Sequence, residues 1–520
     1  MPAGEPNGHP AAFSRASLAL IIPLGLLAAL LGVQMVTVLG TAATTAVPAA
    51  LLVMALGALP WAVLHRFRCV HRQNLAQGAA AIATIAAGNT LLLPIGLPMA
   101  LGRPDLVLPL FAGVVLALIV DLLLAWRLFA TPAFPAEAAW PQGRAAAETL
   151  LAGQEGERRG VALLLGIAAG AVGAMYRVPM LAFGLAFLAP PWPLAAFAIG
   201  LLVRGHAPDL PSGWLPDLMR AQVPQGLLLG AALAAVAQLV VVALRRRAEA
   251  RAVPPALALA FAAHLGIAVL LALAGGLASR LGPGMLLLFV AYAAIAAFVH
   301  LLACGLAAMH TGWLPALALA MIALTLGLLL GFPPAALCLV TAFTAATGPA
   351  FAALGQALAT GRILREGTPP GFEQEGTRQQ LRAALLAAAI AVLVVALAHA
   401  PLFAAGRIPP MDHVYAIAIR AGTAPDVFMR MLPWAIAGAA LQLAGGPTRQ
   451  LGLLFATGLM LLNPAAGWAL LAGLACRELA RRRLRSVTPE DLRAFAGGTI
   501  AGDALYGLYD SAWRLAAGRR

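Results

Sequence analysis

A few acidic side chains interrupt long apolar stretches of the sequence. Asp121 lies within the apolar run Leu116–Trp126, Glu148 follows small residues in Trp140–Gly153, and Asp503 follows several glycines. A charge inside a bilayer costs several kcal/mol, on the order of the insertion scales, so acids in such runs mark binding or pairing sites. Each of these carboxylates could bind a proton or a cation.

Two of these acids also have a purely structural interpretation. Asp121 lies about a turn and a half before Arg127 and could pair with it near the end of the run. Arg144 precedes Glu148 by four residues, which is the spacing of an ion pair on one face of a helix. In that interpretation the acid neutralises an arginine and does not titrate.

Asp503 leaves two interpretations open as well. Glycines before it and at Gly507 would let a neighbouring backbone approach, so that the acid faces protein. Alternatively, Asp503 lies on the polar side of a short amphipathic helix with Asp510 and Arg514.

Catalytic and metal-binding motifs do not appear. No nucleophile elbow, HExxH pair or tight acidic cluster is present, and the histidines and cysteines lack metal-ligand spacing. They are His264, His300, His310 and His399, with Cys69, Cys304, Cys338 and Cys476. We therefore expect no catalytic residues, no bound metal, no cofactor and no enzymatic activity.

The composition indicates an all-α polytopic membrane protein. The 520 residues are 62% hydrophobic and 10% charged, and a membrane helix needs about 20 apolar residues. Such runs include Leu18–Gly40, Leu106–Phe129, Gln222–Leu244, Pro255–Ser279 and Leu381–Phe403. The length allows about 14 to 16 transmembrane helices, some of them broken or re-entrant. The net charge of +14 comes from arginines at the ends of these runs, so we expect lipid rather than nucleic acid as the partner.

The arginines also predict an orientation. Three clusters, Arg66–Arg72, Arg245–Arg251 and Arg477–Arg485, should be cytoplasmic by the positive-inside rule. Residues 1–17 are then a short cytoplasmic tail before an uncleaved first span, and residues 18–516 form one transmembrane domain. The expected location is the bacterial cytoplasmic membrane.

Broken segments are the candidates for lining a cavity. Trp140–Gly153 contains Pro and Gly, and Val178–Arg204 is interrupted by three prolines. Irregular backbone at membrane depth needs protein or water around it. Pro349–Gly361 ends with the same spacing of residues as Trp140–Gly153, which suggests related halves of about 18–244 and 255–516. A chance match in an Ala- and Gly-rich chain is the alternative.

Four stretches, in order, resemble the oligopeptide transporter superfamily, which includes the yellow-stripe-like metal-chelate carriers. They are Trp140-Pro-Gln-Gly with Ala-Glu-Thr-Leu-Leu-Ala-Gly153, Gly355–Gly361 with Gly367-Thr-Pro369 and Gln379-Gln380, Leu432-Pro-Trp434, and Ile500–Gly507. The chain departs from the pattern at Arg144, where the family has a small residue. Ala357 and Ala359 stand where it often has Asp and Lys.

The resemblance implies a proton-coupled secondary transporter of short peptides or peptide-like metal chelates. The candidate substrate or coupling residues are Glu148, Asp503, Gln142, Arg144, Gln356, Thr360 and, from its apolar run, Asp121. The alternatives are a membrane-embedded enzyme acting on lipid and a non-transporting membrane partner of the same fold.

Overall fold

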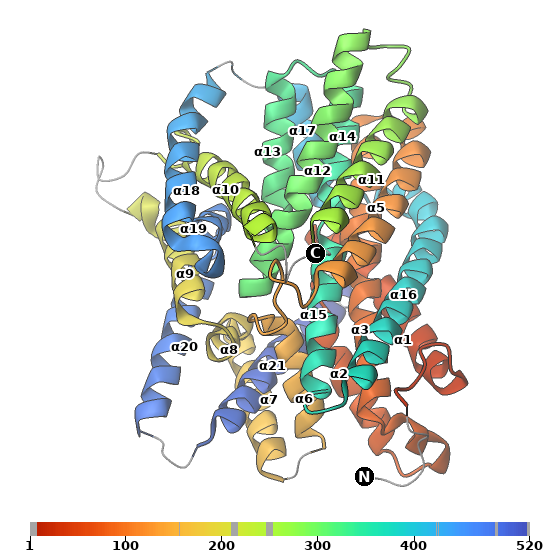
Figure 1. The fold of residues 1–520 in the computed structure, drawn as a ribbon, viewed down its shortest axis with the longest axis vertical. Helices are drawn as coiled ribbons and strands as arrows, with labels where there is room; N and C mark the ends of the chain where they lie inside the picture. The colour runs from red at the N-terminus through yellow and green to blue at the C-terminus, as the bar shows by residue number, and fades with distance from the viewer. Residues whose placement is uncertain are drawn as a thin grey trace.

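The fold consists of α-helices (Figure 1), in a computed structural model that describes residues 8–154, 157–209, 217–245, 253–422, 424, 426–483 and 487–516. Within these ranges no β-strand occurs. In the described part of the chain, ten helical stretches are long and apolar enough to cross a membrane, and three shorter apolar helices accompany them. The predicted all-α polytopic fold is confirmed. The long stretches are fewer than the 14 to 16 crossings expected. Some other apolar runs form shorter helices, and the long helices Pro464–Arg483 and Pro489–Ala516 carry more charged residues.

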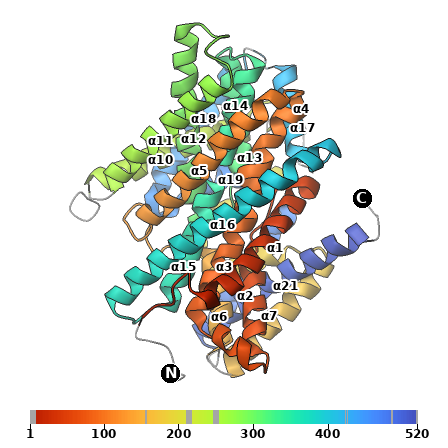
Figure 2. The ribbon, with the colours of Figure 1, turned by 90° about the vertical axis from the view of Figure 1, so that its right-hand side faces the viewer.

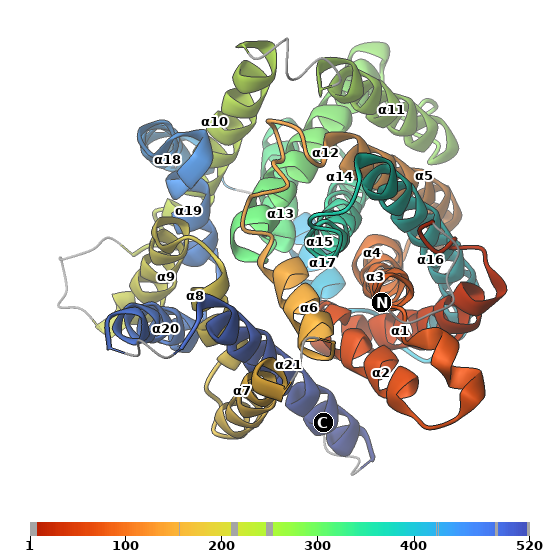
Figure 3. The same cartoon turned by 60° about the horizontal axis from the view of Figure 1, so that its bottom comes forward.

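Two groups of helices lie side by side (Figure 3). The outer helices of the larger group are α1 (Arg15–Leu39), α2 (Ala46–Ala58), α5 (Val107–Leu128), α11 (Val253–Ala274), α12 (Pro283–Thr311), α13 (Ala316–Leu329), α16 (Pro370–Ala404) and α17 (Pro410–Ala421). Helix α6 (Pro141–Ala152) lies between this group and the second one.

Two interrupted spans occupy the centre of the larger group. One is Val70–Leu101, in which the π-helical segment η2 (Ala86–Leu92) separates α3 (Val70–Ile85) from α4 (Leu93–Leu101). The other joins α14 (Pro334–Ala346) and α15 (Pro349–Leu364). Their most apolar windows are 100% and 94% buried, against at most 50% in the other long stretches. The outer helices therefore separate both spans from lipid.

The second group is held together by close contacts at glycines. It contains α7 (Glu157–Met175), α8 (Met180–Leu188), α9 (Pro191–His206), α10 (Val223–Arg245), α18 (Val427–Arg449), α19 (Leu451–Met460), α20 (Pro464–Arg483) and α21 (Pro489–Ala516). A methyl group on Gly170 of α7 would lie 2.2 Å from the Thr499 carbonyl oxygen of α21. Gly438 of α18 packs equally closely on Leu227 of α10. Without a side chain at these positions, the helices meet backbone to backbone, as is common in membranes.

The predicted break in Val178–Arg204 is present. Helix α8 ends at Leu188 and α9 begins at Pro191, so Ala189 and Pro190 separate them. The segment Trp140–Gly153, in contrast, forms the regular helix α6. Its irregular backbone is limited to Trp140, whose φ is 37°.

The N-terminal segment requires a correction. Helix α1 begins at Arg15 rather than Leu18, because the Ser14 hydroxyl accepts a hydrogen bond from the Ser17 N–H and caps the helix. Ala12 is fully buried, and its N–H donates to Oε1 of Gln379 at 2.8 Å. Ala12 thus anchors the segment before α1 to α16, and the predicted tail of residues 1–17 overlaps the first turn of α1.

Each helix group draws on both parts of the chain, with α7–α10 and α18–α21 together in the second group. The two related halves stay a prediction.

The arginine clusters that predict the orientation are described only in part. Arg245 ends α10, and Arg477 to Arg483 lie in α20. Arg246, Arg247, Arg251 and Arg485, which complete the predicted cytoplasmic clusters, lie outside the described residues.

Candidate functional site

The segments Trp140–Gly153 and Pro349–Gly361, whose similar endings suggested that they are counterparts in two halves, are in direct contact. The Gly143 N–H of α6 donates to Oε1 of Gln356 on α15 at 2.8 Å, and the Thr360 hydroxyl donates to the Gly143 carbonyl at 2.9 Å. A methyl group on Gly143 would lie 2.2 Å from the Gln356 carbonyl oxygen. This contact requires glycine and joins α6 to the central span.

The glutamines of both segments also bind the end of α12. The Nε2 of Gln356 donates to the Ala308 carbonyl at 2.8 Å, and the Nε2 of Gln142 donates to the Gly312 carbonyl at 2.7 Å. Gln142, Gln356 and Thr360 therefore form hydrogen bonds between helices in this conformation. They position α6, α12 and α15 relative to one another.

Asp121 caps the N-terminus of α15. Its carboxylate is completely buried, and Oδ2 accepts a hydrogen bond from the Gly348 N–H at 2.6 Å. Gly348 precedes the first residue of α15, where backbone N–H groups lack helical partners and the helix dipole favours an anion. The acid of α5 thus stabilises a helix that begins inside the protein.

The alternative pairing of Asp121 with Arg127 is wrong. The Arg127 guanidinium lies 5.8 Å from the centre of the Trp126 ring, and no ion pair joins it to Asp121 among the described residues. Six residues along an α-helix correspond to a rotation of about 240°. Asp121 therefore faces the protein interior while Arg127 is exposed.

Asp503 makes the same type of contact as Asp121. Its Oδ2 accepts a hydrogen bond from the Leu181 N–H, in the first turn of α8, at 3.0 Å. Nearby, Gly498 and Gly502 of α21 lie against the backbone of α7. The carboxylate is half-buried and faces protein, on a helix of 28 residues rather than a short amphipathic one.

Glu148 lies between two arginines that the sequence did not pair with it. Only 3% of the residue is exposed, and its oxygens lie 3.4 Å from Nη2 of Arg159 on α7 and 3.2 Å from Nε of Arg493 on α21. The expected partner, Arg144, instead directs its Nε toward the Ala139 carbonyl at 3.5 Å. The predicted Arg144–Glu148 pair is wrong, because helices α7 and α21 bring other guanidinium groups to the carboxylate.

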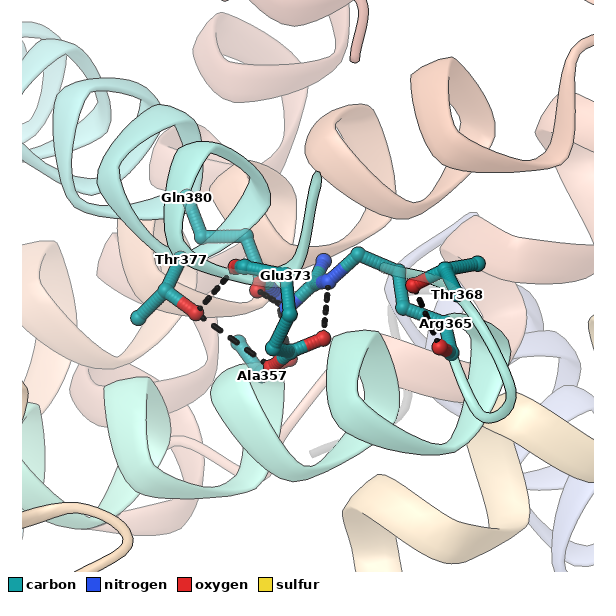
Figure 4. Close-up of polar contacts among 6 residues, drawn as sticks. All are labelled: Ala357, Arg365, Thr368, Glu373, Thr377 and Gln380. Carbon is teal, nitrogen blue, oxygen red and sulfur yellow. Dashed lines mark hydrogen bonds and ion pairs between the residues drawn. The ribbon is translucent and has the colours of Figure 1, made fainter. Parts of the chain in front are cut away.

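The loop motif between Gly361 and Gln380 is organised around Arg365, which the sequence reasoning missed (Figure 4). The Arg365 side chain is fully buried, its Nε donating to Glu373 at 2.7 Å and its Nη2 to Gln380 at 2.8 Å. A methyl group on Gly361 or Gly376 would lie 2.6 Å from this guanidinium. The two glycines were the signal that could have indicated the buried arginine.

Neutral polar groups without partners line the two central spans. Asn74 and Gln77 of α3 are buried and bond to each other at 3.0 Å, which leaves Nδ2 of Asn74 and Oε1 of Gln77 without hydrogen bonds. The buried hydroxyls of Thr90 in η2, and of Thr341 and Thr344 in α14, also lack partners. Buried polar atoms in native proteins are normally hydrogen-bonded. These groups are therefore available to a polar ligand or to water.

The sequence reasoning missed these positions because it searched for charged residues. Within the described ranges, no three His, Cys, Asp or Glu side chains come together as metal ligands would.

A scan against protein-family models found no match, and neither did a search of curated proteins.

Proposed function

We propose that the protein is a secondary transporter whose pathway runs along the two central spans. The observation that carries the proposal is the set of buried polar groups without partners on the two interrupted spans, which apolar helices enclose. A protein with only a structural role gains nothing from buried donors and acceptors that lack partners, since each costs about 1–3 kcal/mol. A transporter needs such groups to exchange hydrogen bonds with a polar solute.

The interruptions support the same function. Irregular backbone at membrane depth is typical of transporters, where it is buried in protein or lines a cavity. The break at Thr347–Gly348 and the π-helical turn of η2 lie in these central spans. Each places a potential hinge beside the unpaired hydroxyls of Thr90 and Thr344.

The substrate class follows from the chemistry of the lining together with the resemblance to oligopeptide transporters. Amides such as those of Asn74 and Gln77 both donate and accept, which matches the N–H and C=O groups of a short peptide. A peptide-like metal chelate offers similar groups and brings its own metal ligands. A proton gradient across the bacterial cytoplasmic membrane would drive uptake, and Glu148 or Asp503 would be the acid that binds and releases the proton.

Uptake into proteoliposomes tests this function. Labelled di- to tetrapeptides or chelated iron should accumulate with an inward proton gradient and not in protein-free vesicles. Turnover of a lipid without solute movement would instead identify a membrane-embedded enzyme. Neither activity, together with a stable complex with another protein, would identify a non-transporting membrane partner.

A further inference from the structure

A groove of about 600 Å³ lies between α1 and α16, on the outside of the larger helix group. The two helices run side by side there (Figure 2). From α1 the lining includes Leu27, Leu30 and Gln34, and from α16 and the turn after it Ala398, Leu402 and Arg407. Leu27 and Leu30 are 50% and 54% exposed. Both helices are candidate membrane spans, so in a bilayer the groove would face lipid.

The groove follows from the sizes of the side chains on the two helices. Leucines of α1 face Ala398 and Ala405, which are too small to fill the space between the helices. Pro401 lies inside the last turns of α16, where it has no N–H to donate to the helical hydrogen bonds. Nearer the N-terminus of α1, Gly25 lies close to Ile390, so the two helices are in contact beside the groove.

Arg407 supplies a charge at one end of this apolar groove. Helix α16 ends at Ala404, and Arg407 follows within a turn that closes on the Leu402 carbonyl at 2.9 Å. The residue is exposed, and within the described part of the chain no acid forms an ion pair with it. An arginine just beyond an apolar span lies at the depth of lipid headgroups.

We propose that the groove binds an anionic phospholipid, with an acyl chain between α1 and α16 and the phosphate on Arg407. The apolar lining would contact the chain by van der Waals packing, which favours association inside a bilayer where no hydrophobic driving force acts. The guanidinium would bind two phosphate oxygens through parallel N–H groups. The inference is independent of transport, because none of these residues belongs to the central spans.

Native mass spectrometry of the full-length protein tests this assignment. Delipidated protein is titrated with phosphatidylglycerol, with phosphatidylcholine of the same acyl chains, or with inorganic phosphate alone. We expect saturable binding of phosphatidylglycerol, weaker binding of phosphatidylcholine, and no displacement of lipid by inorganic phosphate. Arg407→Ala should lower the retention of phosphatidylglycerol about fivefold, and Ala398→Trp should lower it by filling the groove.

Two matched variants serve as controls. Leu397→Trp adds the same side chain to α16 at a residue that is 70% exposed and outside the groove. Arg280→Ala removes an exposed arginine from the turn after α11. Both should retain lipid at the wild-type level. If Ala398→Trp does not fold, Ala405→Phe fills the same groove. Retention at the wild-type level by Arg407→Ala or by the groove-filling variant would overturn the proposal. Equal binding of both lipids, or displacement of lipid by inorganic phosphate, would overturn it as well.

Discussion

At the scale of single residues, the buried acids are explained by the groups that they meet on other helices. Asp121 and Asp503 each accept a backbone N–H at the start of a helix, α15 and α8 respectively. Glu148 faces two guanidinium groups. All three acids contribute to holding helices together, and a coupling role for Glu148 or Asp503 has to be separated from that contribution.

Glu148→Gln separates the two roles. If Glu148 carries the coupling proton, the variant should fold and insert, and its uptake should no longer depend on the proton gradient. If the acid only neutralises Arg159 and Arg493, the variant should lose about 3–5 kcal/mol of stability, and the added change Arg493→Gln should restore most gradient-driven uptake. Thermal unfolding and uptake of both variants are the measurements. Full gradient-driven uptake by Glu148→Gln alone would exclude it as the coupling acid, and Asp503→Asn is the corresponding test for the other acid.

At the scale of helices, the contact between α6 and α15 depends on Gly143. The change Gly143→Ala places a methyl group 2.2 Å from the Gln356 carbonyl oxygen, and we expect a loss of about 1–3 kcal/mol from overpacking. Gly266→Ala on α11 is the matched control, because nothing lies within 4 Å of its added methyl group. That variant should gain about 0.5–1 kcal/mol from helix propensity. Unfolding in denaturant compares the two, and equal stabilities would show that the glycine contact is unimportant.

The packing of the N-terminal segment should depend on pH. The His9 ring lies 5.2 Å from the rings of both His71 and Phe372, and burial, reinforced by Arg365 and His71, lowers the pKa of His9 to about 3. The neutral form is therefore the one that packs. Stability from this contact is complete above the unfolded value of about 6.5 and is lost as the pH falls toward 3.

A cysteine that replaces Ala12, in a cysteine-free background, measures whether the N-terminal segment detaches at low pH. Its labelling, relative to the unfolded protein at each pH, should increase between pH 7.5 and 4.5. His9→Phe keeps a ring in the contact without a charge, so its labelling should stay low at both values. Equal acid-induced labelling of both proteins would assign the release to other groups.

At the scale of the whole molecule, the orientation is the simplest prediction to test. Arginine-rich loops resist translocation, so the loops after α10 and α20 should both be cytoplasmic. Cysteines replacing Glu249 and Ser486, two positions outside the described residues, should label from the same side in intact cells. Labelling from opposite sides would refute the predicted topology.

The sequence was sufficient for the fold class, since apolar runs of helical length specify membrane helices whatever their partners are. The similar endings of Trp140–Gly153 and Pro349–Gly361 also singled out two segments that are in contact, although the hydrogen bonds between Gly143 and Gln356 were not predicted. It could not predict the partners of Glu148 and Asp121. Those partners come from helices far along the chain, and spacing within one helix gives no information about them. Arg365 was missed because its burial depends on Gly361 and Gly376, on two different helices, packing against it. The amides of Asn74 and Gln77 were missed because the sequence reasoning searched for charged residues.

Accessibility of Thr344 is the most direct test of the central claim that the interrupted spans form the transport pathway. A cysteine there, in a cysteine-free protein with measurable uptake, should react with a small membrane-impermeant thiol reagent, and substrate should protect it. Thr325→Cys is the control, because that hydroxyl lies on α13 and bonds within its own helix to the Met321 carbonyl at 3.0 Å. The account predicts labelling and protection at Thr344 and neither at Thr325. The account would be contradicted if the Thr344→Cys variant still took up substrate but its cysteine did not react from either side of the membrane, with or without substrate.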